Sequence, residues 1–181
     1  MGAVASDAGA PDAGAPSVGD SATQLVHGTC LEIGGCGVLI LGAPGSGKSD
    51  VALRLIDQPG RGTGHDTLTA RLVADDQVVI TRRGDRLFVA PPAPLAGLIE
   101  VRGIGIVAAD HVPEAELGLA VRLADARGIE RLPEDGNSLL LLDVAIPEIA
   151  VDPAAASAPA RIRAGVIEVL RARASRGLAP E

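Results

Sequence analysis

Short apolar runs bounded by Gly, Pro and Asp recur from about residue 23 onward, and runs of this kind predict β-strands. Residues 30–33 and 36–41, which two glycines separate, predict a hairpin that leads into a buried strand. A second hairpin is predicted over residues 78–81 and 87–90, and a further strand over residues 71–74. We therefore expect the first half of the chain to be rich in hairpins.

Two later runs predict strands that differ in burial. Over residues 117–123, Leu and Val occupy alternate positions, which predicts a strand with one buried face. Residues 139–142 are all leucine, a continuous apolar run typical of a strand that is buried on both faces. We therefore expect the second run to be the more deeply buried.

Two stretches place apolar residues at helical spacing. The first stretch ends at Pro59 and Gly60, and its apolar face comprises Val51, Ala52, Leu55 and Ile56. The second lies near the C-terminus, and its apolar stripe comprises Ile162, Val166, Val169 and Leu170. Four arginines surround that stripe: Arg161, Arg163, Arg171 and Arg173. Strands and helices in one chain of this length predict an α/β domain.

Length and composition predict one domain behind a low-complexity tail. The chain has 181 residues, a length typical of a single domain. Residues 1–20 are mainly Ala, Gly, Pro, Ser and Asp, which cannot offset the entropy of ordering, so we expect a disordered tail before a domain spanning residues 21–181. No apolar run reaches the roughly 18 residues of a membrane span, and the N-terminus lacks signal-peptide features. These features predict a cytoplasmic protein that does not bind membranes.

Charge and aromatic content narrow the possible ligands. The formal net charge is −7, which argues against a nucleic acid as the main partner, so any phosphate site must be built locally. Phe88 is the only aromatic residue. An adenine ring would therefore be held mostly by aliphatic and backbone contacts.

Two cysteines lie close together in the first hairpin. Cys30 and Cys36 are six positions apart, and His27 precedes the first by three. A structural zinc site requires four ligands with paired spacing, and this segment offers at most three. We therefore expect two reduced thiols packed among apolar neighbours.

The strongest motif is a glycine-rich turn between the buried strand and the first helix. Its glycines let backbone N–H groups converge on phosphate oxygens at a helix N-terminus. The lysine ammonium can reach the outer phosphates, and the serine hydroxyl can ligate Mg²⁺. The motif therefore predicts a site for ATP and Mg²⁺ at Gly42, Ala43, Pro44, Gly45, Ser46, Gly47, Lys48 and Ser49.

Acidic residues follow the motif at two places. Asp75 and Asp76 end an apolar run on a strand that could lie beside the motif's strand, where carboxylates can bind Mg²⁺ or accept a hydroxyl proton. A solvated turn is the alternative interpretation. Glu100 lies within an apolar stretch, either as a buried carboxylate that requires Mg²⁺ or Arg102, or as an exposed residue on an edge strand. His27 alone would more often be structural.

These segments together resemble one enzyme family. The order HG, GVLILGAPGSGKSD, LVADDQV and APPAPLAGLIEVRGIGI is similar to the catalytic domain of bacterial HPr kinase/phosphorylase. The similarity covers about residues 27–109, and LIEVRGIGI close behind ADD is more specific than the glycine-rich turn. Farther on, IERLP and VAIPEIAV resemble later segments of the family.

The resemblance implies a fold, an activity and an assembly. The fold would be the P-loop kinase type shared with phosphoenolpyruvate carboxykinases, a mixed sheet with flanking helices. The activity would be ATP-dependent phosphorylation of a serine on HPr, the small phosphocarrier of the sugar phosphotransferase system, or on its nitrogen-related relative. The assembly would be a hexamer.

The resemblance also implies roles for individual residues. Gly42 to Ser49 would hold the ATP phosphates, and Ser49 with Glu100 would hold Mg²⁺. Asp76 would be the general base in phosphorylation and the acid in the reverse reaction, supported by Asp75. Further active-site positions match His27, Lys48 and Arg131, and the segment from Glu100 to Ala109 would serve both activities.

Two departures from the family pattern are visible. Longer members carry an additional N-terminal domain that the short tail cannot form, so this chain resembles a version with the catalytic domain alone. The late loop that serves dephosphorylation usually carries basic residues and Asn, whereas here it is DPAAASAPA. We therefore expect weak or missing phosphorylase activity.

Other function classes remain open at this stage. A small-molecule kinase would share the motif but usually has an arginine-rich lid, which is not evident over residues 60–66. A non-catalytic nucleotide-sensing module would bind ATP without chemistry at Asp76. A decarboxylating carboxykinase is disfavoured because the chain is too short for a second substrate domain.

Overall fold

The computed structural model describes residues 22–131, 136–175 and 177, and the tail expected over residues 1–20 lies outside these ranges. The strands are β1 (Thr23–His27), β2 (Thr29–Ile33), β3 (Cys36–Leu41), β4 (Ala70–Ala74), β5 (Gln77–Arg83), β6 (Arg86–Ala90), β7 (Leu98–Val101), β8 (Gly105–Ala108), β9 (Ala115–Leu123), β10 (Ser138–Leu141) and β11 (Val144–Val151). The helices are α1 (Lys48–Asp57) and α2 (Ala158–Ser175), with short 3-10 turns η1 (Ala93–Leu95) and η2 (Ala126–Gly128). Neither helix of this described part has the length and apolar character needed to cross a membrane.

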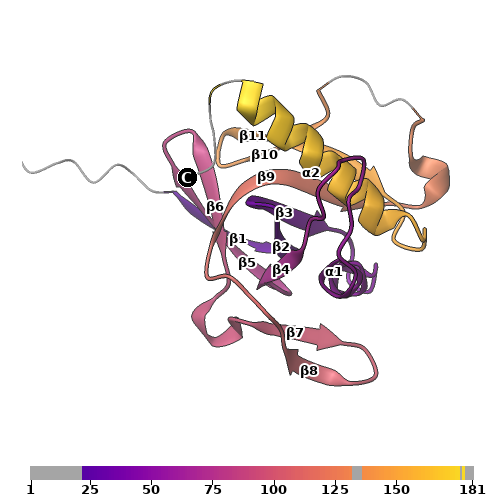
Figure 1. Cartoon of the computed structure of the whole chain (residues 1–181). Helices are drawn as coiled ribbons and strands as arrows, with labels where there is room; N and C mark the ends of the chain where they lie inside the picture. The colour runs from indigo at the N-terminus through magenta and orange to yellow at the C-terminus, as the bar shows by residue number, and fades with distance from the viewer. Residues whose placement is uncertain (1–21, 132–135, 176, 178–181) are drawn as a thin grey trace, which may run out of the picture.

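A mixed sheet forms the centre of the domain (Figure 1). Its main path runs β1-β5-β6-β9-β3-β2-β4. Strand β9 is parallel to β3 on one side, while on the other side β6 pairs antiparallel with its beginning and β11 pairs parallel with its end. The strands β3 and β9 approach closely at Gly37, where an added Cβ would stand 2.7 Å from the backbone oxygen of Glu116. The predicted mixed sheet is thus confirmed.

Both helices cover the same face of the sheet (Figure 1). Their buried residues join the side chains that β2, β3 and β9 direct toward that face. The core on this side contains Leu31, Val38, Ile40, Val51, Leu55, Leu72, Leu119, Val121, Ile162 and Val166, among others. The spacing of the helix residues follows the amphipathic pattern that predicted the two helices.

Strands, rather than helices, cover the opposite face. The buried residues of this second core all come from strands or residues next to them, and they include Cys30, Leu39, Val73, Val78, Ile80, Leu87, Val89, Leu117, Leu141 and Ile146. Alternate residues of β2 and β3 therefore face two different cores, so their apolar runs are continuous. The hairpin β5–β6 and the pair β10–β11 supply the cover.

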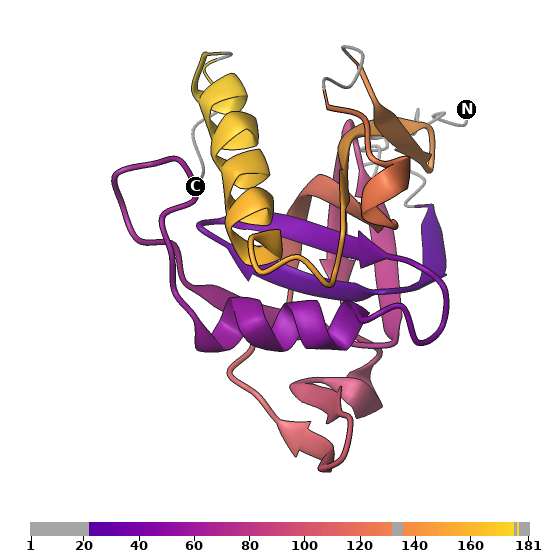
Figure 2. The same ribbon diagram turned by 90° about the vertical axis from the view of Figure 1, so that its right-hand side faces the viewer.

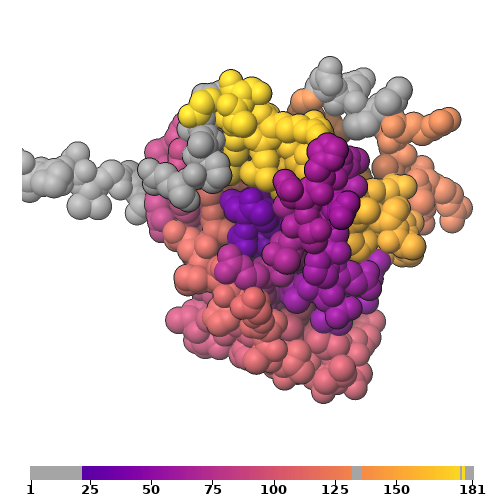
Figure 3. Space-filling model, in the orientation of Figure 1, coloured from indigo at the N-terminus to yellow at the C-terminus, as the bar shows by residue number. Residues whose placement is uncertain are grey.

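Two peripheral segments frame the rest of the domain. The hairpin β7–β8 forms its own two-stranded sheet and projects from the body below α1 (Figures 1 and 2). Ile99 anchors it in the core, while Ile104 and Ile106 are exposed. The loop of residues 58–69 runs beside α2 (Figure 2), and its atoms lie against those of α2 in the space-filling view (Figure 3).

Three expectations about strands were wrong or incomplete. Residues 117–121 of the first run are buried on both faces in the centre of the sheet, whereas residues 138–141 form an edge strand in which Leu140 is 66% exposed. The strand β4 does not lie beside β3, because β2 separates them. Sequence analysis also missed β1, whose residues are mostly exposed and which pairs with β5.

Candidate active site

The glycine-rich turn connects β3 to the first residue of α1. Gly45 and Gly47 have φ angles of 75° and 95°, a left-handed region that glycine occupies without steric cost. At Gly42 an added Cβ would stand 2.5 Å from Oγ of Ser46, so a larger residue there would displace that hydroxyl. The hydroxyl of Ser46 is buried without a hydrogen-bond partner in the described residues. The turn is thus folded as the sequence motif predicts.

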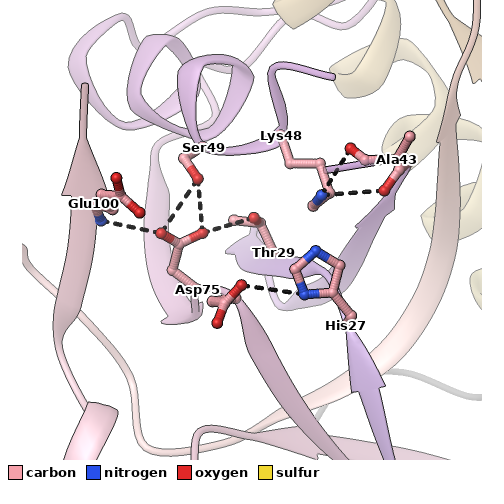
Figure 4. A network of polar contacts seen from close by, with 9 residues as sticks. His27, Thr29, Ala43, Lys48, Ser49, Asp75 and Glu100 are labelled. Atoms are coloured by element: carbon pink, nitrogen blue, oxygen red, sulfur yellow. Dashed lines mark hydrogen bonds and ion pairs between the residues drawn. The ribbon is translucent and has the colours of Figure 1, made fainter. Parts of the chain in front are cut away.

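Lys48 extends along the inside of this turn (Figure 4). Its side chain is only 8% exposed, and Nζ donates to the carbonyl oxygens of Gly42 and Ala43 at 3.1 and 3.2 Å. No carboxylate of the described residues forms an ion pair with it. The carbonyl oxygens do not neutralise the ammonium, so its positive charge can attract an anion that enters the cavity.

Asp75 lies at the centre of a polar network that joins four segments of the chain (Figure 4). Its carboxylate accepts from the hydroxyl of Thr29 at 2.7 Å, from the hydroxyl of Ser49 at 3.0 and 3.2 Å, and from the backbone N–H of Glu100 at 3.0 Å. Asp75 is 7% exposed. Ser49, the second residue of α1, is therefore in direct contact with the residue that follows β4, although β4 and β3 are not neighbours.

Asp76 occupies an unusual turn directly after Asp75. Its φ is 68°, and Gln77 N–H donates to the carbonyl oxygen of Asp75 at 2.8 Å, the i to i+2 bond of a γ-turn. Positive φ is rare for a residue with a side chain, and such strain concentrates at functional sites. The turn directs the Asp76 carboxylate outward, 67% exposed, where Oδ1 lies 3.1 Å from Nδ1 of His27.

Glu100 and Arg131 differ in how they relate to this network. Glu100 is exposed on β7, so the buried alternative is wrong, and its backbone rather than its carboxylate contacts Asp75. Its side chain nevertheless borders the same cavity as Ser49. Arg131 is exposed after η2 and does not border that cavity.

A cavity of about 600 Å³ adjoins the turn, and most of the predicted site residues line it. Aliphatic side chains contribute to its wall through Pro44, Leu53 and Val101, as expected for a chain with one aromatic residue. Its lining comprises His27, Thr29, Pro44, Gly45, Gly47, Lys48, Ser49, Asp50, Leu53, Asp75, Asp76, Glu100, Val101 and Arg102. One cavity therefore joins the glycine-rich turn to exposed and buried carboxylates.

The donor set of the cavity suits Mg²⁺ bound together with phosphates. Mg²⁺ prefers hard oxygen ligands and is usually held by one or two carboxylates plus the phosphates of a substrate. The hydroxyl of Ser49, the carboxylate of Asp75 and the carboxylate of Glu100 provide such oxygens. Within residues 22–131, 136–175 and 177, no group of three His, Cys, Asp or Glu side chains could hold an ion by itself.

The two cysteines take no part in this site. Both are free and buried. Burial raises the pKa of Cys36 to about 11 and also raises the pKa of Cys30 well above its usual value. Both are therefore neutral thiols at physiological pH, in agreement with the expectation of packed, reduced cysteines.

Two features of the site escaped sequence analysis. Thr29 is a fully buried donor to Asp75, and its polar side chain inside an apolar run was the available signal. The late loop DPAAASAPA lies against the glycine-rich turn, since a Cβ on Gly47 would stand 3.5 Å from that of Pro153. Arg54 on α1 holds this loop by donating to the carbonyl oxygens of Pro153 and Ala155.

Comparison with known proteins gives a consistent result for most of the chain. A family model described as HPr Serine kinase C-terminal domain matches residues 20–176. A solved structure, the Hpr(Ser) kinase/phosphatase from Coxiella burnetii, superposes with a TM-score of 0.61 and covers 85% of this chain and 98% of its own. It shares 24% sequence identity, so this likeness supports the P-loop kinase fold alone.

Two curated relatives are HPr kinase/phosphorylases of other bacteria. The protein of Brevibacillus brevis is 35% identical over 158 residues, which are 81% of this chain and 46% of the relative. The protein of Levilactobacillus brevis is 34% identical over 139 residues, which are 71% of this chain and 42% of the relative. The chain thus spans less than half the length of these relatives.

Proposed function

This chain belongs to the HPr serine kinase C-terminal domain family, and from that premise we propose that it is an ATP-dependent protein serine kinase. Its substrate would be a serine hydroxyl on the phosphocarrier HPr or on the nitrogen-related relative of HPr, in regulation of the phosphotransferase system. The observation that supports this proposal most is the contact between Ser49 of the glycine-rich turn and Asp75, directly before the exposed carboxylate of Asp76.

The residues of the cavity suit the binding of the nucleotide. The phosphates of ATP would lie in the turn from Gly42 to Ser49, next to the ammonium of Lys48 and the N-terminus of α1. Ser49 and Glu100 would hold Mg²⁺, which supplies charge neutralisation on the phosphoryl group. Phosphoryl transfer depends mainly on such positioning and charge stabilisation.

Asp76 suits the role of general base. Its carboxylate is exposed at the mouth of the cavity, where the hydroxyl of a substrate serine can approach it. In the proposed step, Asp76 accepts the hydroxyl proton, the serine oxygen forms a bond to the γ-phosphorus, and the bond from that phosphorus to the bridging oxygen breaks to release ADP. His27 orients the carboxylate through their 3.1 Å contact.

The substitution Asp76→Asn tests this function against the nucleotide-sensing alternative. Asparagine tolerates positive φ, so the fold and ATP affinity should persist, while labelling of the phosphocarrier serine by radioactive ATP and Mg²⁺ falls about 10²–10⁴-fold. Mass spectrometry of the wild-type product identifies the modified residue. Asp143→Asn is a matched control, since Asp143 also has positive φ, at 62°, and lies outside the cavity. Unchanged turnover in Asp76→Asn would contradict the assignment.

The late loop supports a proposal of weak phosphorylase activity. The segment DPAAASAPA contributes no basic side chain beside the glycine-rich turn, where inorganic phosphate would have to attack the phosphoserine. We expect little pyrophosphate release when the phosphoserine carrier is incubated with the protein, Mg²⁺ and phosphate. Release as fast as the forward reaction would contradict this.

Assembly and location are part of the same proposal. A hexamer is expected from the resemblance, and light scattering coupled to size-exclusion chromatography measures it. Arg131, which stands apart from the cavity, would act only on substrate that extends beyond it. A cytoplasmic location follows from the proposed use of ATP and a phosphocarrier, and cell fractionation tests it.

A further inference from the structure

The charge of Asp75 requires an explanation, because this carboxylate is buried without a cation. In the described part of the chain no lysine, arginine or histidine forms an ion pair with it, although it is only 7% exposed. A buried carboxylate is tolerated when several donors bind its charged form. Here three donors do so: the hydroxyls of Thr29 and Ser49 and the backbone N–H of Glu100.

The hydroxyl of Ser49 is directed by this carboxylate. It lies within hydrogen-bond distance of both carboxylate oxygens and acts as the donor, since an ionised carboxylate can only accept. A serine hydroxyl that donates its hydrogen bond to Asp75 keeps the lone pairs of its oxygen for another partner. Those lone pairs are what a metal ligand requires, so the orientation of Asp75 determines whether Ser49 can bind Mg²⁺.

Thr29 in turn determines the orientation of Asp75. Its hydroxyl is 2.7 Å from Oδ1, the shortest bond to this carboxylate, and comes from a side chain that is 0% exposed. A β-branched side chain on a strand has restricted χ1 freedom, which fixes the direction of the donor. Valine would fill the same volume and suit the neighbouring apolar core, so packing alone does not explain the hydroxyl.

We propose that Thr29 is a positioning residue: it holds Asp75 so that Asp75 accepts the hydrogen bond of the Ser49 hydroxyl, which leaves the lone pairs of the Ser49 oxygen free to ligate Mg²⁺. Thr29 is fully buried although it borders the cavity, and the role assigned to it acts through Asp75. The inference rests on the proposed function, because it concerns the Mg²⁺ that would accompany ATP. The contacts thus run from Thr29 on β2 through Asp75, directly after β4, to Ser49 on α1 (Figure 4).

The variants Thr29→Val and Thr29→Ser separate the hydroxyl from the methyl group. Calorimetric titration with ATP at a series of Mg²⁺ concentrations, and with ATP in EDTA, measures metal-dependent and metal-free binding for each variant. We expect Thr29→Val to raise the Mg²⁺ concentration for half-maximal enhancement of ATP affinity about tenfold, with ATP binding in EDTA unchanged within twofold. Thr29→Ser should restore the wild-type Mg²⁺ dependence.

Several outcomes decide the proposal. It is overturned if Thr29→Val has the wild-type Mg²⁺ dependence, or if Thr29→Ser is as impaired as Thr29→Val, since the methyl group would then matter. A loss of metal-free ATP binding equal to the loss with Mg²⁺ also overturns it, because that pattern indicates general damage. Thr23→Val, an exposed threonine on β1, is the control for the substitution itself. Failure of the wild type to bind ATP under any condition would instead overturn the proposed function.

Discussion

The two ends of helix α1 each hold a buried cation, and the two cations differ in what surrounds them. At the N-terminus, Lys48 is 8% exposed and donates to carbonyl oxygens of its own turn beside an open cavity. At the C-terminus, Arg163 from α2 is 2% exposed and donates to the carbonyl oxygens of Leu55, Gln58 and Leu68. Neither has a carboxylate partner among the described residues.

The helix dipole explains why these similar arrangements have opposite consequences. A cation near a helix C-terminus is stabilised by the partial negative charge of the last carbonyl groups, which Arg163 also satisfies as a cap. A cation near the N-terminus meets partial positive charge and unpaired N–H groups, so Lys48 lies where an anion is favoured. The pKa of Arg163 is lowered by burial, yet its three acceptors keep the guanidinium in place. One end of α1 is therefore completed by the protein, and the other would be completed by the proposed nucleotide.

The largest expected effect comes from Lys48→Met. We expect proposed phosphoryl transfer to fall about 10²–10³-fold, because charge stabilisation at the transferring group is lost. The free energy of unfolding should be unchanged or slightly higher, since a buried cation has been removed from the unfavourable end of the helix. Initial rates and urea unfolding measure the two quantities. If Lys48→Met lowered the free energy of unfolding as much as an Arg163 variant does, the two cations would not differ in the way described.

The next largest effect is expected from Arg163→Met. One buried and two partly buried carbonyl groups lose their donor, which should lower the free energy of unfolding by roughly 3 kcal/mol, while the folded fraction keeps the proposed ATP affinity. Urea unfolding measures this loss. Arg161→Met is the matched control, because Arg161 is exposed on the same helix and should change stability by less than about 0.5 kcal/mol. Equal losses in both variants would show that Arg163 is no structural cap.

The smallest effect sharpens the comparison at a third place, the strained turn at Asp76. Glycine adopts positive φ without steric cost, so Asp76→Gly should raise the free energy of unfolding by up to about 1 kcal/mol. The exposed contact with His27 adds little to stability. Thermal unfolding of the variant and the wild type measures this difference in stability. A variant less stable than the wild type would mean that the turn is not strained.

Sequence analysis predicted the local turns and helices more accurately than the burial of the strands. The glycine-rich turn, the two aspartates and both helices follow from local rules, because turn chemistry and amphipathic spacing act within a few residues. Strand burial depends on which strands become neighbours. Residues 117–121 are buried on both faces because the helices cover one face of this central strand and other strands cover the opposite face, whereas the leucines of residues 138–141 lie at an edge.

The missed residues share one property: their roles depend on partners far away in the chain. Thr29 meets Asp75 across 46 positions, and Arg163 reaches Leu55 across 108. Arg163 was expected only as one of the charges around an apolar stripe, because the sequence does not show that the loop of residues 58–69 lies beside α2. Lys48, by contrast, is recognisable from its motif, and it is the only lysine in the sequence.

The four segments that meet at Asp75 also determine when the site can exist. Four segments contribute to the cavity: residues 27–29, 42–49, 75–76 and 100–102. No disulfide joins the two cysteines. A chain still emerging from the ribosome would hold the complete glycine-rich turn long before residue 100 is free to donate to Asp75. Capture of a nucleotide should therefore require that β7 has docked against Asp75, and should not follow from the glycine-rich turn alone.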